Sequence, residues 1–384
     1  MALHALRWVL LVAAMAPSAY YLMAIYCARD YFRGAKRGRR GHSDFRPPVS
    51  VLKPVRGMDR DAYENFASFC RQNYPSYEVL FAVAEPDDPV IPIIQKLQGD
   101  LPQVPVRLIV GVEQLGANRK LNNLARLAKE AAHEVLVIND SDVRVDEDYL
   151  QRIAGHFGDP QVGAVTAFFR GITHGSLGAR LEALVLSTET VPNALVARKL
   201  EGRVRFAFGW TMATTKTHLR AIGGFEDMVN VHSDDFELGN RIAAQGLTIE
   251  LLDEPVDMIF PNESFFTYLR HELRWAIGLR NVRPSGYWGL LFTFGLPWTI
   301  LAVVLAPSAL WALGYVTSYL FLRCFQVWFT GVWGLNDRVT RSSWWLVPLR
   351  DGINFLTWIV GFFTSEIEWR GIRYKVKQGK LIRV

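Results

Sequence analysis

The sequence has few cysteines and lacks the glycine-rich loops that commonly bind phosphate. Its 384 residues include three cysteines, Cys27, Cys70 and Cys324, whose spacing matches neither a disulfide framework nor a thiolate metal site. This scarcity fits a reducing compartment for the soluble part of the chain. The sequence contains no Gly-X-Gly-X-X-Gly or Walker motif, which argues against a dinucleotide-binding or P-loop protein. A metal ion, lysine or arginine would therefore have to hold any nucleotide phosphates.

Charged residues are nearly absent from two long stretches near the ends of the chain. Within residues 286–333 the only charged residue is Arg323, and this length allows two membrane spans broken near Pro307. Residues 7–27 are also long and apolar enough to span a bilayer. A cleaved signal peptide is the alternative, but the stretch is too long and has no small-residue cleavage site before the charges that follow. We therefore expect an N-terminal anchor over residues 1–30 and two spans over 286–333.

Residues 344–384 contain a shorter apolar segment followed by a basic tail. The apolar part, 353–363, is short for a span unless residues 344–348 join it, and that would bury Arg350 and Asp351. We expect a re-entrant, interfacial or third membrane segment here.

Basic residues form two clusters, each directly after an apolar segment. They are Arg33, Lys36, Arg37, Arg39 and Arg40, and then Arg370, Arg373, Lys375, Lys377, Lys380 and Arg383. Nucleic acid could bind such runs, but basic residues beside membrane spans are typical of the cytoplasmic side. We therefore expect no nucleic-acid partner, and a soluble region on the cytoplasmic face of an integral membrane protein. The basic tail then requires an even number of crossings after that region.

Residues 45–285 have the pattern of a soluble α/β domain. Short apolar runs predict strands at 49–52, 77–83, 106–110 and 135–138, separated by predicted helices at 62–72, 90–99 and 119–132. This alternation predicts a doubly wound sheet of the nucleotide-binding type. Further strands are predicted at 162–168 and 206–214, and helices at 176–198, 233–245 and 268–283.

Acidic residues follow two of these strands and begin one of the helices. Asp140 and Asp142 end the 135–138 strand, where ligands bind in open α/β sheets, and an Asp-X-Asp there suits a divalent cation that holds a diphosphate. A capped turn is the structural alternative. Glu85 and Asp87 follow the 77–83 strand. Asp235 opens a helix, where it could instead serve only as a partner of the helix dipole.

The local sequences resemble those of one enzyme family. The segments that carry the resemblance are 50–57, Asp87-Asp88-Pro89, 118–124, Asp140-Ser141-Asp142, Asp235 and Arg274-Trp275. They are similar to membrane-bound glycosyltransferases with the GT-A (nucleotide-diphospho-sugar transferase) fold, and in particular to ceramide glucosyltransferases and the bacterial relatives that glycosylate hopanoid lipids. The resemblance implies transfer of glucose or N-acetylglucosamine from a UDP-sugar to a hydroxyl of a membrane lipid, a hopanoid polyol or ceramide, with inversion. It also implies a bacterial inner-membrane protein.

The resemblance assigns a role to each candidate residue. Asp235 is the expected catalytic base, and Asp140 and Asp142 are the expected ligands of Mg²⁺ or Mn²⁺. The substrate- and nucleotide-binding candidates are Glu85, Asp87, Lys120, Asp140, His271, Arg274 and Trp275.

This sequence departs from the family pattern at two of these positions. Glu85 replaces the first aspartate of the family, and His271 replaces the first Gln or Arg of (Q/R)XXRW, where the neighbouring Arg270 could substitute. A processive polysaccharide synthase is an alternative, although it should have more spans and a glutamine at position 271. A membrane protein without catalytic activity is the second alternative.

Overall fold

The computed structural model describes residues 1–37, 44–173 and 175–384, so Arg39 and Arg40 of the first basic cluster lie outside the described residues. The chain divides into two compact units, which we call the helical unit and the sheet unit. The helical unit comprises Met1–Gly34, Thr173–Leu200 and Asn262–Gln378, and the sheet unit comprises Ala35–Ile172, Glu201–Pro261 and Gly379–Val384.

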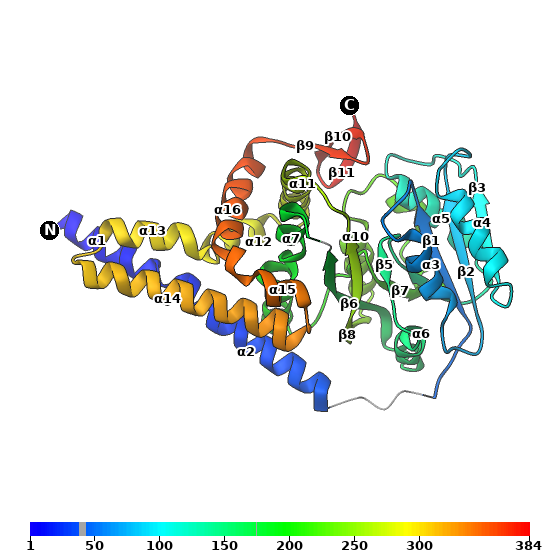
Figure 1. The fold of residues 1–384 in the computed structure, drawn as a ribbon, viewed down its shortest axis with the longest axis horizontal. Helices are drawn as coiled ribbons and strands as arrows, with labels where there is room; N and C mark the ends of the chain where they lie inside the picture. The colour runs from blue at the N-terminus through cyan, green and yellow to red at the C-terminus, as the bar shows by residue number, and fades with distance from the viewer. Residues whose placement is uncertain (38–43, 174) are drawn as a thin grey trace. The chain divides into compact units, whose positions relative to one another are not determined.

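The sheet unit is built on eight strands in the order β3-β2-β1-β4-β7-β6-β8-β5 (Figure 1). Their bounds are β1 (Val49–Val55), β2 (Tyr77–Val83), β3 (Val106–Val110), β4 (Val135–Ile138), β5 (Val143–Arg144), β6 (Val162–Thr173), β7 (Met212–Thr215) and β8 (Thr248–Phe260). The first four strands pair in parallel, and β7 then pairs antiparallel with both β4 and β6. The sheet is therefore doubly wound only in its first half and mixed in its second.

Six α-helices belong to the sheet unit among its described residues. They are α3 (Ala62–Cys70), α4 (Ile91–Asp100), α5 (Arg119–Glu130), α6 (Tyr149–Ala154), α9 (Lys216–Ala221) and α10 (Asp234–Ala244). Strands β1, β2 and β4 are buried along almost their whole length, as their apolar, β-branched sequences require of the middle of a parallel sheet. A final short strand, β11 (Lys380–Arg383), lies against the Asn230–Val231 segment.

Three of the predicted strands are wrong in their bounds, and one of them, predicted over 162–168, runs on to Thr173 as β6. We predicted that the first would stop before Lys53 and Pro54, but β1 runs on to Val55. Its ladder with β4 ends at Leu52 while its ladder with β2 continues, and proline is tolerated where a strand is paired along one edge. The strand predicted over 206–214 is reduced to β7, because the backbone N–H groups that precede it donate to side chains rather than to a neighbouring strand.

The helical unit consists of ten α-helices and one hairpin among its described residues. The helices are α1 (Ala2–Ala13), α2 (Ala16–Arg37), α7 (Leu177–Ala183), α8 (Val191–Glu201), α11 (Phe265–Val282), α12 (Pro284–Gly289), α13 (Gly295–Leu305), α14 (Ala309–Trp328), α15 (Arg338–Ser343) and α16 (Val347–Phe363). A π-helical turn at Leu186–Thr190 separates α7 from α8, within the helix predicted over 176–198. Strands β9 (Glu366–Trp369) and β10 (Ile372–Lys377) pair antiparallel in the region predicted as a basic tail.

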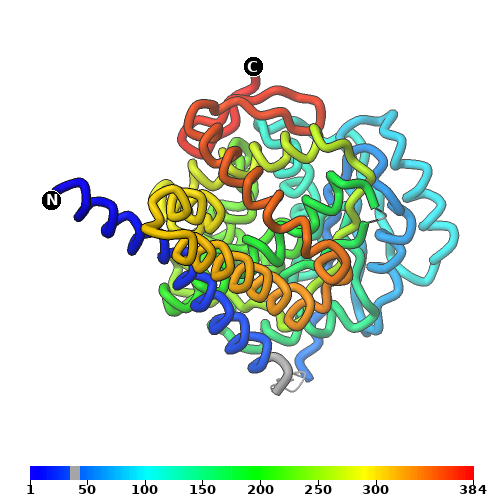
Figure 2. Tube along the Cα trace, turned by 60° about the vertical axis from the view of Figure 1, so that its left-hand side comes forward, coloured from blue at the N-terminus to red at the C-terminus, as the bar shows by residue number. Residues whose placement is uncertain are grey.

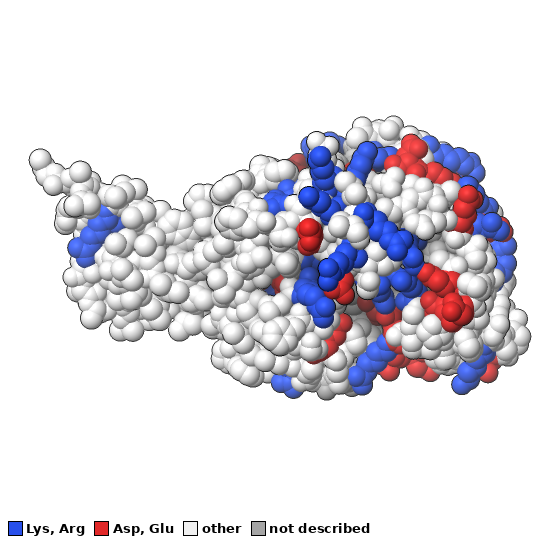
Figure 3. All heavy atoms as spheres, turned by 90° about the horizontal axis from the view of Figure 1, so that it is seen from above, with Lys and Arg blue, Asp and Glu red and all other residues white. Residues whose placement is uncertain are grey.

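Helices α1, α13 and α14 pack side by side (Figures 1 and 2). Figure 3 shows that charged side chains are sparse over this end of the helical unit on the face it presents. Among the described residues, Ala2–Gly34 and Arg338–Phe363 are long and apolar enough to cross a membrane, and α12 with α13 forms a third candidate bent by 43°. The predicted break near Pro307 falls between α13 and α14. The number of crossings stays a prediction.

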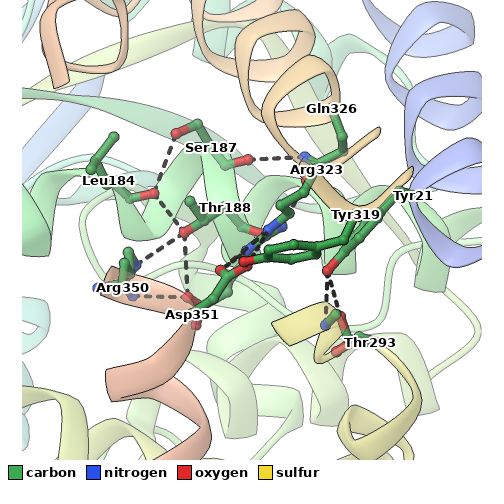
Figure 4. A network of polar contacts seen from close by, with 12 residues as sticks. Tyr21, Leu184, Ser187, Thr188, Thr293, Tyr319, Arg323, Gln326, Arg350 and Asp351 are labelled. Atoms are coloured by element: carbon green, nitrogen blue, oxygen red, sulfur yellow. Dashed lines mark hydrogen bonds and ion pairs between the residues drawn. The ribbon is translucent and has the colours of Figure 1, made fainter. Parts of the chain in front are cut away.

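Polar side chains form a buried network inside the helical unit (Figure 4). Arg323 on α14 forms an ion pair with Asp351 on α16 at 2.6 Å, and Tyr319 also donates to Asp351. Arg350 is completely buried and lies between Glu189 and Glu272. Because these charges are paired, the Arg338–Phe363 segment can bury Arg350 and Asp351 within an apolar helix bundle.

Candidate active site

Strand β4 delivers the Asp140-Ser141-Asp142 segment to the carboxyl end of the central strands. All four residues of β4 are buried, so its hydrophobic sequence fixes where the strand stops. The buried Asn139 then donates its side-chain amide to the Tyr149 hydroxyl at 2.7 Å and to the Trp210 carbonyl at 2.8 Å. These bonds fix the direction in which the two carboxylates leave the strand.

Lys120 lies among the carboxylates at this edge of the sheet. Asn118 caps α5 by accepting a hydrogen bond from the Leu121 N–H, and this places Lys120 in the first helical turn. Its Nζ is 2.7 Å from Asp140 Oδ1 and 3.1 Å from Asp234 Oδ2. Burial opposes the charged ammonium, but the two carboxylates outweigh burial and raise the pKa of Lys120 above its usual value. Lys120 is therefore a fixed positive charge in the site.

Asp235 occupies the first turn of α10, and two backbone hydrogen bonds fix its carboxylate. The Gly209 N–H donates to Oδ2 at 2.9 Å and the Phe236 N–H donates to Oδ1 at 2.7 Å. Burial, followed by the adjacent charge of Asp234, raises the pKa of Asp235 to about 6, although Lys120 and both backbone bonds act in the opposite direction. A carboxylate with this pKa is a stronger base than an aspartate in water and is still ionised near neutral pH.

Gly209 borders three of these side chains at once. A Cβ at this position would lie 3.2 Å from Lys120 Nζ, 3.4 Å from Asp235 Oδ2 and 3.5 Å from Asp140 Oδ2. The structure therefore brings Lys120, Asp140 and Asp235 together around a position that has no side chain. Sequence reasoning assigned no role to Gly209 or Asp234, although both lie in segments that it examined.

The donor chemistry of Asp140 and Asp142 fits a divalent cation. Both residues offer carboxylate oxygens, which Mg²⁺ and Mn²⁺ prefer, and Asp140 Oδ2 points toward the space left by Gly209. The Asp142 carbonyl accepts a hydrogen bond from the Ile259 N–H at 2.9 Å, and Ser141 donates to Asp59. The backbone between the two candidate ligands is therefore held from both sides.

Lys53 is completely buried behind the same turn, and sequence reasoning missed it. Its Nζ donates to the Asp140 carbonyl at 2.7 Å and lies 3.9 Å from the centre of the Phe69 ring. Burial lowers the pKa of Lys53 to about 7, although the negative charges of Asp140, Asp142 and Asp59 oppose that shift. A lysine inside an apolar strand was the signal in the sequence that could have identified it.

The acidic residues after β2 have different surroundings. Glu85 forms an ion pair with Arg119, and Asp87 is exposed. Asp88 is buried and accepts hydrogen bonds from the Gly57 N–H at 2.8 Å and the Val90 N–H at 3.0 Å. Asp88 therefore has a structural role in this loop, and Glu85 and Asp87 stay as candidates for the nucleotide side.

The other predicted site residues lie on α11 in the helical unit. His271 Nδ1 is 3.0 Å from Glu182 Oε1 and 3.3 Å from Glu263 Oε2. Burial and the charge of Glu182 raise the pKa of Glu263 to about 7, although His271 and Arg274 lower it. The (Q/R)XXRW position occupied by His271 is therefore part of a partly buried acid–imidazole cluster.

The rest of that motif follows one turn later on α11. The Arg274 guanidinium lies 5.8 Å from the centre of the Trp369 ring on β9, within the range of a cation–π contact. Trp275 is half-buried. Arg270, the expected substitute for the family's Gln or Arg, is exposed and pairs with Glu368 at 3.4 Å.

The sequence profile of glycosyl transferase family 21 matches residues 6–382, nearly the whole chain. The chain belongs to glycosyl transferase family 21. Proteins similar to it include ceramide glucosyltransferase 3 of Caenorhabditis elegans, 24% identical over 231 residues that cover 60% of this chain and 50% of that protein. The ceramide glucosyltransferase of Candida albicans is 34% identical over 116 residues, covering 27% of this chain and 21% of that protein. The chain thus spans about half or less of the length of these relatives.

Among solved structures, this family 21 protein is similar to the mannosyltransferase PcManGT from Pyrobaculum calidifontis, which was solved in complex with GDP-Man and Mn²⁺. The TM-score is 0.57 at 20% sequence identity, and the match covers 91% of this chain and 99% of PcManGT. The likeness shows the fold. The predicted GT-A class and the predicted resemblance to ceramide glucosyltransferases are therefore confirmed.

Proposed function

We propose that this protein transfers one sugar from a UDP-sugar to a hydroxyl group of a membrane lipid, with inversion at the anomeric carbon. The observation that carries the proposal is the cluster of Lys120, Asp140 and Asp235 around Gly209 at the carboxyl end of β4. It combines a candidate base, a fixed positive charge and a candidate cation ligand. Membership of family 21, whose relatives include proteins named ceramide glucosyltransferase, supports glycosyl transfer to a lipid.

Asp235 is the proposed catalytic base. A single displacement with inversion needs a group that takes the proton from the acceptor hydroxyl as its oxygen attacks the sugar. The two backbone N–H groups of Gly209 and Phe236 hold the Asp235 carboxylate in a fixed position, and its pKa of about 6 leaves it ionised near neutral pH.

Positive charge is needed where the diphosphate departs. Lys120 supplies one charge at the sheet edge, and we assign a second to Arg274. Asp140 and Asp142 would hold Mg²⁺ or Mn²⁺, which when bound supplies Lewis-acid and template chemistry to the diphosphate. Glu85 and Asp87 are assigned to the nucleotide side, and Trp275 to the acceptor side.

The membrane segments support a lipid acceptor. The helical unit offers candidate spans near both ends of the chain, and the basic clusters that follow them are typical of the cytoplasmic face. We propose that the sheet unit works at the cytoplasmic surface of a bacterial inner membrane. There it would receive a water-soluble UDP-sugar, and a hopanoid polyol or ceramide would offer its hydroxyl from the bilayer.

The test uses membranes that contain the full-length protein, labelled UDP-glucose or UDP-N-acetylglucosamine, and added ceramide or hopanoid polyol. A lipid whose mass increases by one hexose or one N-acetylhexosamine supports the proposal. A ladder of added sugars would favour the processive alternative. No transfer from any nucleotide sugar by folded protein would refute glycosyl transfer.

A matched pair of variants tests the proposed base. Asp235→Asn should abolish transfer, whereas Glu237→Gln removes one charge from the same turn of α10 and should retain it. Glu237 pairs only with the surface-accessible Arg241 among the ion pairs described for it, at 2.7 Å. Equal activity in the two variants would contradict the assignment of Asp235.

A further inference from the structure

The cluster of Glu182, Glu263 and His271 has a composition that the proposed transfer does not explain. Its three members come from separate segments: Glu182 from α7, Glu263 from the residue before the α11 cap, and His271 from the second turn of α11. One ligand atom from each lies within 4.8 Å of the others. All three belong to the helical unit, so their geometry is independent of how the two units are arranged.

The distances in the cluster match those expected around a single metal ion. Ligand atoms bound about 2.1 Å from a tetrahedral Zn²⁺ are about 3.4 Å apart. His271 Nδ1 is 3.0 Å from Glu182 Oε1 and 3.3 Å from Glu263 Oε2. An ion would therefore need only small movements of these side chains.

The cluster also has more negative than positive charge of its own. The Glu182 side chain is 6% exposed and that of Glu263 is 17% exposed, so water screens neither carboxylate well. The cluster thus has two carboxylates and one imidazole, and Arg274 is a cation that also acts on Glu263. A bound divalent cation would offset the mutual repulsion of two carboxylates held this close together.

The backbone around the cluster is held firmly, as a preorganised site requires. A Cβ at Gly178 on α7 would lie 2.9 Å from the carbonyl oxygens of Glu263 and Ser264, so glycine permits the close approach of α7 to the start of α11. Ser264 caps α11 by accepting a hydrogen bond from the Thr267 N–H at 3.1 Å. On the other side, Arg350 donates to the Leu181 carbonyl, beside Glu182.

We propose that Glu182, Glu263 and His271 form a divalent-cation site, separate from the one proposed at Asp140 and Asp142, and that it prefers Zn²⁺. One imidazole nitrogen with two carboxylates suits Zn²⁺ better than Mg²⁺, which favours oxygen ligands alone. Three protein ligands leave a fourth position for water or another oxygen ligand. This role also gives a physical reason for a histidine where the family pattern has Gln or Arg.

The test measures Zn²⁺ binding directly, without reference to transfer activity. The sample is full-length protein in detergent with the substitutions Asp140→Asn and Asp142→Asn, which remove the other proposed cation site. EDTA removes any bound metal, and the protein is then titrated with Zn²⁺. We expect one equivalent of tightly bound zinc. Its X-ray absorption spectrum should show one imidazole nitrogen together with oxygen ligands.

Variants in the same background assign the ligands. Since loss of an outer-shell partner alone costs about 10- to 100-fold in metal affinity, His271→Gln and Glu263→Gln should each raise the Zn²⁺ dissociation constant by at least about 100-fold. Glu366→Gln, an exposed acid on β9, is the control and should leave it unchanged. If the Asp140→Asn, Asp142→Asn background protein takes up no zinc, or if all three variants bind zinc equally well, the cluster is only an ion pair and the proposal is overturned. His271→Gln restores a residue of the family pattern, so it offers a second variant should Glu263→Gln fail to fold.

Discussion

Arg350 and Glu272 form a buried ion pair, and removing the arginine alone should cause a large and pH-dependent loss of stability. Arg350 is completely buried and donates to the Thr188 hydroxyl at 3.0 Å (Figure 4). It also donates to the Leu181 carbonyl at 2.8 Å and to the Tyr268 hydroxyl at 2.8 Å. Both terminal nitrogens also lie 3.2 Å from the Glu272 carboxylate. One guanidinium thus joins α7, the π-helical turn and α16 to α11, the helix that carries Arg274.

Arg350→Met keeps a long apolar side chain but leaves the Glu272 carboxylate, which is 4% exposed, without its principal cation. Breaking a buried pair from one side costs about 3–5 kcal/mol. Burial already raises the pKa of Glu272 to about 7, and Arg350 opposes that rise, so the variant should raise it further. A folded-state pKa above the unfolded value lowers the free energy of unfolding as pH rises, so the loss should be larger at pH 8 than at pH 5.5.

Urea unfolding in detergent, followed by tryptophan fluorescence, measures this loss. The double variant Arg350→Met with Glu272→Leu removes both charges of this pair and leaves Glu189, the other acidic partner of Arg350, whose side chain is 21% exposed and can be solvated. It should recover much of the stability, because a buried pair can often be replaced by apolar residues without loss. A cost below about 1 kcal/mol for Arg350→Met alone, or no recovery in the double variant, would refute the reasoning.

Three further predictions concern the site on the sheet unit. If Asp235 is the base, its pKa of about 6, rather than the usual 3.8, should set the pH dependence of transfer. We expect kcat/KM to fall about tenfold per pH unit below pH 6 and to level off above pH 7. A flat profile from pH 5 to 8 would contradict this. Gly209→Ala should lower kcat while leaving the melting temperature nearly unchanged, because its Cβ would contact Lys120 and Asp235; unchanged turnover would show that this space is not used. Lys53→Met should raise the Mn²⁺ concentration needed for half-maximal activity, since the Asp140 carbonyl loses the hydrogen bond from Lys53. Measuring the activity of the variant over a range of Mn²⁺ concentrations checks this. An unchanged half-maximal concentration would exclude a positioning role for Lys53.

The parallel half of the sheet could be predicted from the sequence because its strands are buried and apolar. The predicted bounds of β2, β3 and β4 match the structure. Strand β8 was not predicted, because Asp253, Glu254 and Pro255 interrupt its apolar pattern. The β9–β10 hairpin was missed because its alternating basic residues were assigned to a tail.

The acidic candidates could be identified from the sequence, but their partners depend on the fold. The Asp-X-Asp after β4 and the acid pair that opens α10 both follow local rules for strand ends and helix starts. Nothing local shows that Gly209 would donate its N–H to Asp235, or that Lys53 would support Asp140 from behind. Contacts of this kind join segments far apart in the chain, which periodic patterns do not specify.

The position of Lys120, by contrast, follows from topology. Helix α5 comes after a parallel strand, β3, and so begins at the sheet edge where β4 ends, which places its first turn beside Asp140. Asp235 comes from the antiparallel half, where strand order gives no such rule. Its position depends on the turn before β7, in which the Phe208 N–H donates to the Thr166 hydroxyl and the Gly209 N–H donates to Asp235. One of the two bonds that prevent residues 206–211 from forming the predicted strand, the one from the Gly209 N–H, therefore also holds the proposed base beside Lys120.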